Sequence, residues 1–193
     1  MPVLLSNLVA RPPSIEDFHA IAELVAACDI AEHGIADSST RELASRWQHY
    51  SFHLESDAWV IVTGRKQFVG FACVWHRDYE EFSTFICVHP QYRKRGIGTL
   101  LLRMAEQHAR ELMHHACPGA RVSLRGVVSA KNAQARSLFE REGYLLIREF
   151  WRVTLELVES GDDASHSGKF AVDVGVESGQ LVGTTPLSDR EGI

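Results

Sequence analysis

A strand that ends at a proline, followed by a basic glycine turn and an amphipathic helix, limits most strongly what this chain can fold into. The apolar run Phe85–Val88 is followed by Pro90, and the turn Arg93–Gly98 has the pattern R-x-x-G-x-G with three basic side chains. Glycine lets the backbone approach a ligand closely, and the free N–H groups at a helix N-terminus favour an anion. The segment therefore predicts a pyrophosphate site between a strand and a helix.

Two other phosphate-binding loops fit this segment less well. The sequence has no G-x-G-x-x-G followed by an acidic residue after a second strand, so a Rossmann dinucleotide site is disfavoured. It also has no G-K-[ST], which the Walker loop requires. Taken alone, R-x-x-G-x-G leaves one structural alternative open, a glycine turn with a solvated basic face.

Hydrophobic periodicity and turn residues predict an alternation of strands and helices. We expect strands at Val3–Ala10, Ala58–Thr63, Phe68–Trp75, Phe82–Val88 and Arg121–Val128, with one or two more within Tyr144–Val158. We expect helices from Ser14 to the break at Gly34, from Ser38 or Ser39 to Tyr50, over Gly98–His115, and from the cap Asn132 to Gly143. The three strands between 58 and 88 predict an antiparallel meander, and the helices that follow imply at least one parallel crossover.

The composition changes near Glu159. Residues 1–158 are expected to form one domain, residues 159–169 a linker, and residues 170–193 a tail with short strands at Phe170–Val176 and Gln180–Val182. Because this tail is too short to fold alone, three arrangements stay open. It packs on the main domain, pairs with a partner chain in a homodimer, or begins a second domain.

Composition and charge exclude several classes of partner. Of the 193 residues 45% are hydrophobic and 23% charged, as in globular domains, and the net charge of −5 disfavours a nucleic-acid or anionic membrane surface. No apolar run approaches the length of about 20 residues that spans a bilayer, and no signal peptide is recognisable, so we expect a cytoplasmic protein. The four cysteines form no C-x-x-C pair and predict reduced, mostly buried thiols, and no metal motif is present.

Two segments resemble the GNAT superfamily of N-acetyltransferases: Ile86–Thr99 with the following Leu100-Leu101, and Asn132–Tyr144. The resemblance covers roughly Val3 to Leu157. It implies an α+β fold in three layers, with a mixed, mostly antiparallel twisted sheet of six to seven strands flanked by about four helices. It also implies acetyl-CoA as the co-substrate and a primary amine, on a small molecule or a peptide, as the acceptor.

The resemblance assigns coenzyme contacts by position. The backbone of Ile86, Cys87 and Val88 would pair with the pantetheine arm, and Lys94–Thr99 would hold the pyrophosphate. Asn132 would contact the coenzyme from the start of its helix, and an ordinary N-cap is the alternative role. The coenzyme-binding residues expected in this way are Ile86, Cys87, Val88, Arg93, Lys94, Arg95, Gly96, Ile97, Gly98, Thr99, Asn132 and Phe139.

Catalysis requires that the amine lose its proton, that an oxyanion be stabilised and that the thiolate leave. The strand N–H near Cys87 or Val88 is the expected oxyanion donor. Many family members carry a tyrosine that protonates the thiolate seven residues after the Asn132 position, where this chain has Phe139. Tyr144 is then the candidate acid, with core packing as the alternative.

The candidate general base is Glu81, beside Glu80 at the entry to the third meander strand. Its alternative is a solvated loop carboxylate, since its register differs by one residue from that of relatives with a glutamate nearby. For the acceptor pocket, acidic groups among aromatic rings would suit a cationic amine. Its candidate residues are Glu32, His33, Asp37, Trp47, Trp75, Asp78, Tyr79, Phe150 and Trp151.

The predicted function is direct transfer of an acetyl group from acetyl-CoA to a primary amine. The first alternative is a catalytically weak or inactive acetyl-CoA-binding or regulatory domain, which Phe139 favours. The segment from Cys28 through Trp47 also resembles the N-terminal half of tandem two-domain members, in some of which one half binds coenzyme without catalysing. The second alternative is a structural or dimerising module.

Overall fold

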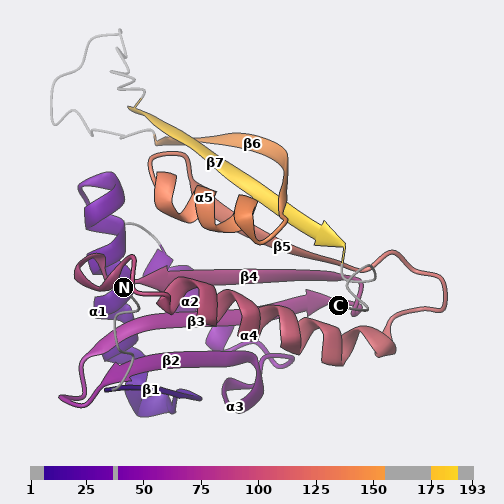
Figure 1. Cartoon of the computed structure of the whole chain (residues 1–193), viewed down its shortest axis with the longest axis horizontal. Coiled ribbons are helices and arrows are strands. Elements are labelled where there is room, and N and C mark those ends of the chain that lie inside the picture. Colours follow the sequence, from indigo (N-terminus) through magenta and orange to yellow (C-terminus); the bar gives the residue numbers. More distant parts are fainter. Residues whose placement is uncertain (1–6, 37–38, 155–174, 187–193) are drawn as a thin grey trace, which may run out of the picture.

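A seven-stranded sheet runs through the protein in the order β1-β2-β3-β4-β5-β7-β6 (Figure 1). The computed structural model describes residues 7–36, 39–154 and 175–186. The strands are β1 Leu8–Arg11, β2 Ala58–Thr63, β3 Phe68–Arg77, β4 Glu81–Val88, β5 Ser123–Ser129, β6 Leu145–Thr154 and β7 Gly175–Pro186. The expected α+β class with a mixed, mostly antiparallel sheet is confirmed.

Helices cover the sheet on both faces. They are α1 Phe18–His33, α2 Ser39–Trp47, α3 Leu54–Asp57, α4 Ile97–Leu112 and α5 Ala133–Arg141, with short 3-10 turns at Ile15–Asp17, Pro90–Tyr92 and Met113–His115. One core lies between the sheet and α1–α2 and includes Phe71 and Cys73. A second lies between the sheet and α4–α5 and includes Val74 and Phe82. Because β3 is buried on both faces, it reads as a nearly continuous apolar run rather than an alternating one.

The first half of the sheet is the predicted antiparallel meander, and the expected parallel crossover is also present. Strand β4 pairs with β3 along its whole length, from Glu81 to Val88. It pairs with the parallel strand β5 only from Glu81 to Thr84, and Thr84 opposite Gly126 is the last pair. Among the described residues, the edge of β4 that faces β5 therefore has no strand partner from Phe85 onward, and the two strands diverge into a wedge.

The last described strand, β7, completes the half of the sheet that contains β5 and β6. Strand β7 lies between β5 and β6 and pairs antiparallel with both. The sequence predicted two short strands here, whereas the structure has one strand from Gly175 onward; residues 159–174 lie outside the described residues. The division into a domain, a linker and a tail remains a prediction.

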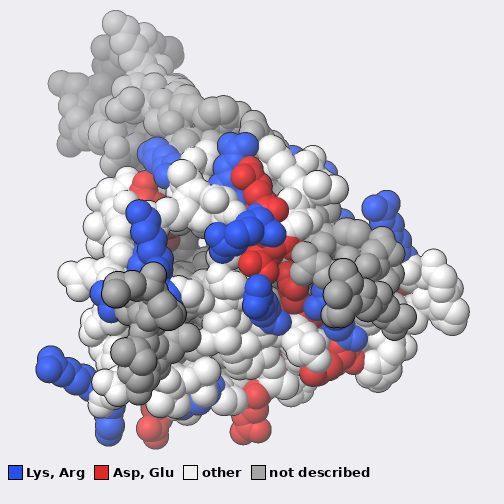
Figure 2. Space-filling model, viewed as in Figure 1, with Lys and Arg blue, Asp and Glu red and all other residues white. Residues whose placement is uncertain are grey.

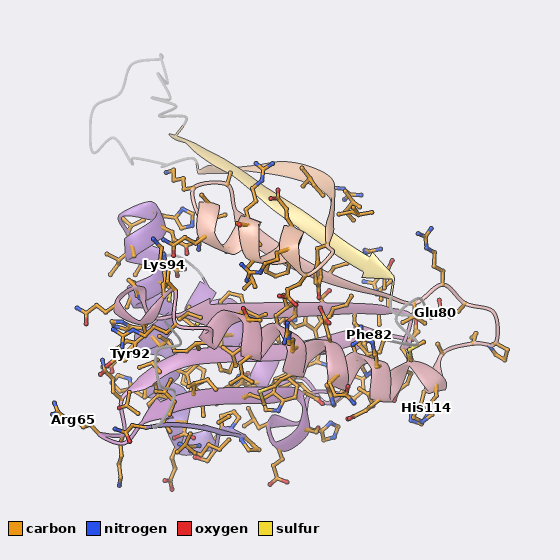
Figure 3. All side chains as sticks on the ribbon, viewed as in Figure 1. Arg65, Glu80, Phe82, Tyr92, Lys94 and His114 are labelled. Atoms are coloured by element: carbon orange, nitrogen blue, oxygen red, sulfur yellow. The ribbon has the colours of Figure 1, made fainter. Side chains whose placement is uncertain are left out.

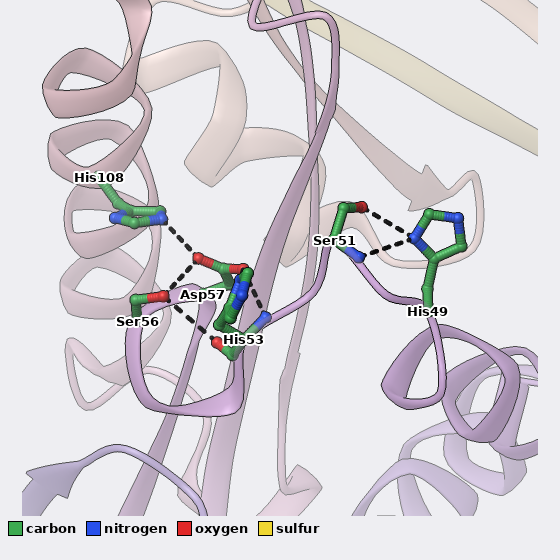
Figure 4. Close-up of polar contacts among 6 residues, drawn as sticks. All are labelled: His49, Ser51, His53, Ser56, Asp57 and His108. Carbon is green, nitrogen blue, oxygen red and sulfur yellow. Dashed lines mark hydrogen bonds and ion pairs between the residues drawn. The ribbon is translucent and has the colours of Figure 1, made fainter.

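Helix α3 is an element that the sequence analysis did not predict. Its short turn is held by Asp57, which accepts hydrogen bonds from the backbone N–H of His53 (2.8 Å) and the hydroxyl of Ser56 (2.8 Å) (Figure 4). His108 of α4 contacts the same carboxylate at 3.0 Å, and its ring also packs edge-on against Trp59. Only four residues long, α3 presents too little periodicity to be recognised from sequence.

Other boundaries differ by a few residues. The first strand ends at Arg11 rather than Ala10, and residues 1–6, which include the start of its predicted range, lie outside the described residues. The second helix ends at Trp47 rather than Tyr50. None of the helices in the described ranges combines the length and the apolar character needed to cross a bilayer. All four cysteines are free; Cys117 is exposed and the other three are buried.

Candidate functional site

The wedge between β4 and β5 opens into a cavity of ≈ 1040 Å³. Its walls come from α1, α2, β3, β4, β5, α5 and the loop between β4 and α4. An extended arm could enter such a wedge and pair with the free edge of β4 as an added strand would. The cavity is therefore the candidate site of the molecule.

Ten of the twelve residues expected to bind coenzyme line this cavity. They are Ile86, Cys87 and Val88 of β4, then Arg93, Lys94, Gly96, Gly98 and Thr99 of the loop and helix start, and finally Asn132 and Phe139. Two do not line it. Arg95 turns back to Tyr92, with its guanidinium carbon 4.8 Å from the ring centroid and an N–H donated to the carbonyl of Gln91. The side chain of Ile97 is buried in the core beside β3. Any contact of these two residues with a ligand in the cavity would have to come from their backbones.

The loop before α4 has the backbone shape of an anion site. Gly96 is the N-cap of α4 with φ +83°, in the left-handed region that glycine adopts without steric cost, and Lys94 also has a positive φ of +63°. The first N–H groups of a helix have no intrahelical acceptor. A side chain at Gly98 would press on Leu138, since its Cβ would lie 3.1 Å from that residue. Lys94 stands at this end of the molecule in Figure 3, whereas basic and acidic side chains lie side by side in the middle of the face that Figure 2 shows.

Glu32 of α1 joins the two sides of the wedge. Its Oε1 accepts a hydrogen bond from Nη2 of Arg93 at 2.9 Å and another from Nδ2 of Asn132 at 2.5 Å. Asn132 meanwhile caps α5 by accepting from the N–H of Ala135 at 2.9 Å, so it has the capping role and also lines the cavity. Arg93 is tied to β4 as well, because its Nε donates to the carbonyl of Val88 at 3.3 Å.

The cysteines at the cavity differ in their acidity. Cys28 donates to the carbonyl of Val88 at 3.3 Å, and its hydrogen bond with Cys87 lowers the pKa of Cys28. The same contact and burial raise the pKa of Cys87, and burial raises the pKa of Cys73 to about 12. Cys87 is therefore held as the neutral thiol, a poor nucleophile, which disfavours a covalent intermediate on it.

Tyr144, the candidate acid, lies in the core rather than in the cavity. It is 3% exposed, is absent from the cavity lining, and its ring packs edge-on against Phe139 with centroids 4.8 Å apart. This placement favours the packing role that the sequence left open. Phe139 does line the cavity, and its ring also lies over the bare Cα of Gly126.

Glu81, the candidate base, stands at the far end of β4. Its Oε1 accepts from Arg125 at 2.6 Å, its side chain is 47% exposed, and it does not line the cavity. Cys87 lies further along the same strand, and at about 3.3 Å per residue the two are roughly 20 Å apart. Its neighbour Glu80 lies at the opposite end of the molecule from Lys94 (Figure 3). These positions argue against Glu81 as the base.

The acceptor candidates divide into three groups. Glu32, His33 and Trp75 line the cavity, whereas Trp47, Asp78 and Tyr79 do not. The side chains of Asp37, Phe150 and Trp151 lie outside the described residues. The cavity residues that the sequence analysis missed include Asp29, Arg46, Ser83 and Arg125. Two of these, Ser83 and Arg125, alternate with buried residues along β4 and β5, a period-two signal that could have placed them on the α1–α2 face.

Comparison with known proteins agrees with this architecture. The acetyltransferase (GNAT) domain family matches residues 55–145, which run from α3 to the start of β6. Residues 55–145 therefore resemble a GNAT acetyltransferase domain. No match to the chain was found among curated proteins. In the part of the chain that the structure describes, no group of three or more His, Cys, Asp or Glu residues is placed to hold a metal ion.

Solved structures of GNAT proteins resemble this chain over most of its length. A GCN5-related N-acetyltransferase from Sphaerobacter thermophilus is 29% identical with a TM-score of 0.74; the match covers 86% of this chain and 52% of that one, so this chain spans about half of that protein. The ribosomal-protein-S18-alanine N-acetyltransferase from Escherichia coli is 17% identical with a TM-score of 0.61, and the match covers 96% of this chain and 99% of that one. YncA from Salmonella typhimurium, solved with its cofactor acetyl-CoA, is 15% identical with a TM-score of 0.61, and the match covers 97% of this chain and 98% of that one. The latter two likenesses show the fold alone.

Proposed function

We propose that this GNAT domain transfers an acetyl group directly from acetyl-CoA to a primary amine. The observation that carries the proposal is the wedge: β4 loses its partner β5 after Thr84, and the left-handed cap at Gly96 lies beyond the end of the same strand. An unpaired strand edge suits the amide-bearing pantetheine arm, and a helix N-terminus with basic side chains suits a pyrophosphate.

The residues of the cavity divide the work of binding and reaction. The free edge of β4 at Ile86–Val88 would align the arm and supply an N–H to the thioester oxygen. Arg93 and Lys94 would neutralise the phosphates, and Asn132 would contact the arm from α5. Acetyl-CoA supplies the activated acyl group, and an uncharged amine lone pair attacks it. Because Cys87 stays a thiol, the proposal needs no acyl-enzyme.

A second function, coenzyme binding with little or no turnover, is favoured by a specific observation. Phe139 has no proton to donate, and neither Tyr144 nor Glu81 lines the cavity. A thiol with a pKa near 8.5 leaves as a thiolate without help at moderate cost. The missing acid therefore predicts a slower enzyme rather than an inactive one.

Two measurements test the proposed function. Calorimetry should show acetyl-CoA binding with one site per chain, and release of free CoA thiol should require both the protein and an amine. If acetyl-CoA does not bind, both functions fail. If it binds but no thiol appears across neutral, cationic and anionic amines between about pH 7 and 9, where the free amine fraction rises, the binding function replaces the enzymatic one.

A further inference from the structure

A row of three residues crosses the sheet on the acceptor side of the cavity. Trp75 of β3 is the register partner of Ser83 of β4, and Ser83 is the register partner of Arg125 of β5. Laterally paired residues point to the same face of a sheet, and strands lie about 4.8 Å apart, so Trp75 and Arg125 flank Ser83 about 10 Å from each other. The row lies one residue before the last β4–β5 pair, at the narrow end of the wedge.

A second guanidinium lies over this row. Arg46 of α2 stacks on the indole of Trp75 with its guanidinium carbon 3.2 Å from the ring centroid, and both residues line the cavity. Stacking on an aromatic face fixes the plane of a guanidinium while its N–H edge can still meet an anion. Arg46 and Arg125 therefore bring two positive charges to the two sides of Ser83.

Arg125 lines the cavity and has a hydrogen-bond donor that is not used within the described part of the protein. Its Nη2 donates to Glu81 at 2.6 Å, but its Nε is buried and has no hydrogen-bond partner. A buried guanidinium N–H without a partner costs free energy that a bound anion would recover. The ion pair with Glu81 occupies Nη2 of Arg125 and fixes the position of its guanidinium, while Nε stays without a partner among the described residues.

The balance of charge in the cavity is basic. Among the described residues its lining includes Arg46, Arg93, Lys94, Arg125 and Arg141, whereas its acidic members are Asp29 and Glu32. Glu32 is engaged by Arg93 and Asn132, and Asp29 and Arg46 each make a further interaction of their own. Arg93 and Lys94 belong to the phosphate end, whereas Arg46 and Arg125 lie at the other end, where the acceptor would enter. The sequence suggested an acidic pocket for a cationic amine. The described residues instead form a cavity whose lining has more basic than acidic side chains.

We propose that the acceptor is an amine that carries an anionic group, such as an amino acid, and that Arg46 and Arg125 bind this group above Ser83. The proposal rests on the proposed function and names its acceptor class. Attack by the amine forms the new C–N bond and breaks the thioester C–S bond; the amine proton is lost to solvent and CoA leaves as its thiolate. The anion takes no part in this step and only positions the amine.

The test compares pairs of acceptors that differ only in the anion. Glycine, β-alanine, 4-aminobutyrate and 6-aminohexanoate are each matched with the alkylamine of the same carbon count, and 1,4-diaminobutane represents cationic acceptors. At least one amino acid should exceed its matched amine by about 10- to 100-fold in kcat/KM, the range expected for a hydrogen-bonded charge. Equal rates for every pair, or a preference for the diamine, overturn the acceptor class and leave the acetyltransferase proposal intact.

Variants then locate the anion site. Arg125→Gln and Arg46→Gln should each lower the amino-acid to alkylamine ratio about tenfold or more through KM, with acetyl-CoA affinity unchanged. Arg65→Gln, which removes one positive charge from the distant β2–β3 turn (Figure 3), should leave the ratio unchanged. If Arg125 only holds Glu81, its variant would lower stability without moving the ratio, and that result overturns the assignment.

A binding measurement covers the case of slow turnover. If no amine reacts, calorimetry on the CoA complex compares 4-acetamidobutyrate with N-butylacetamide, the two corresponding products. Tighter binding of the anionic product, lost in Arg125→Gln, supports the site. Equal or absent binding of the two products overturns it.

Discussion

Asp57 and Glu32 are both largely buried carboxylates near the end of a helix, and each joins segments far apart in the sequence. Their side chains are 13% and 19% exposed. Asp57 connects α3 to α4 where the sheet is continuous, and its donors are His53, Ser56 and His108 (Figure 4). Glu32 instead crosses the opening where β4 and β5 have parted.

The two carboxylates accept similar hydrogen bonds but lie in different surroundings. The contacts of Asp57 lie within one packed unit, so nothing has to enter between them and their loss would cost stability. The partners of Glu32, Arg93 and Asn132, are themselves expected to bind coenzyme, so a ligand entering the wedge competes with the carboxylate for them. We therefore expect changes near Asp57 to alter unfolding and changes near Glu32 to alter binding.

The largest effect is expected at the open end of the wedge, in Gly96→Glu. A carboxylate at the cap of α4 would lie against the bound pyrophosphate, and like charges in contact cost several kcal/mol, so acetyl-CoA affinity should fall by about 100-fold or more. Gly96→Ala is the matched control, because it imposes the same left-handed strain, about 1–2 kcal/mol, without the charge. Calorimetry with acetyl-CoA measures both. Equal affinities in the two variants would contradict the phosphate assignment.

At the closed side, Asp57→Ala should lower the free energy of unfolding by about 2–3 kcal/mol, since it leaves the donors of three hydrogen bonds without their charged acceptor. Urea unfolding measures the change, and acetyl-CoA affinity at low urea should stay at the parental value. The control is Glu55→Ala, an exposed carboxylate on the same short helix. A loss of coenzyme affinity in Asp57→Ala without a loss of stability would remove the distinction between the two regions.

The pKa of Asp57 adds a pH test of the same contrast. Burial acts to raise this pKa, but the hydrogen bonds from His108, the His53 N–H and Ser56 outweigh it, so the pKa is lowered from 3.8. A carboxyl whose folded pKa lies below its unfolded value stabilises the fold above the unfolded pKa, and the contribution is lost as the pH falls through the folded one. The stability difference between the parent and Asp57→Asn should therefore be full at about pH 5 and shrink below about pH 4. A stability difference that grows as the pH falls would contradict a lowered pKa of Asp57.

A smaller effect is expected from Glu32→Gln. The change keeps the size of the side chain but removes the negative charge beside Arg93, so acetyl-CoA should bind about three- to tenfold tighter, as expected for one partly screened charge interaction. The unfolding free energy should change little. Glu23→Gln, on the exposed face of the same helix, is the control. Weaker coenzyme binding in Glu32→Gln would show that Glu32 supports the bound state rather than competing with it.

Of the two regions compared, only the one at the open end of the wedge could be predicted in large part from the sequence. The turn Arg93–Gly98 is contiguous, so its glycines and basic residues predict a phosphate site directly, and ten of the twelve residues expected to bind coenzyme line the cavity. The side chain of Ile97, the first residue of α4, joins Leu101 on the buried face of the helix instead of lining the cavity. The side chain of Arg95 turns back to Tyr92, which spacing alone does not determine. Local motifs and periodic patterns can be predicted from sequence because they depend on residues that are close together in the chain.

The Glu32 contacts could not be predicted, because its partners are 61 and 100 residues away. The same holds for the row Trp75–Ser83–Arg125, which depends on the register of three strands. Glu81 illustrates a related limit: its place at the start of β4 in the sequence does not show which end of the strand meets the ligand. Long-range pairing is set by packing and register rather than by any local pattern.

The smallest effect is expected from Phe139→Tyr, within the wedge itself. The ring position is fixed by Gly126, where an added Cβ would clash with it, and by the edge-on contact with Tyr144. A hydroxyl added to this ring restores a proton donor, but a thiolate leaves readily at moderate pH. We therefore expect kcat to stay the same or to rise by up to about threefold, below the roughly 10²–10⁴-fold usual for general acid catalysis.

Thiol release at about pH 7 and 9, on either side of the ordinary thiol pKa, measures the effect of this hydroxyl. Phe85→Tyr is the control, because it adds the same hydroxyl to a ring that lines the cavity from the α1–α2 face of β4. A rise of about 100-fold or more at the lower pH would show that proton donation limits the reaction. A large loss with lowered stability would instead show that the space above Gly126 admits no further atom, because the Phe139 ring already fills it.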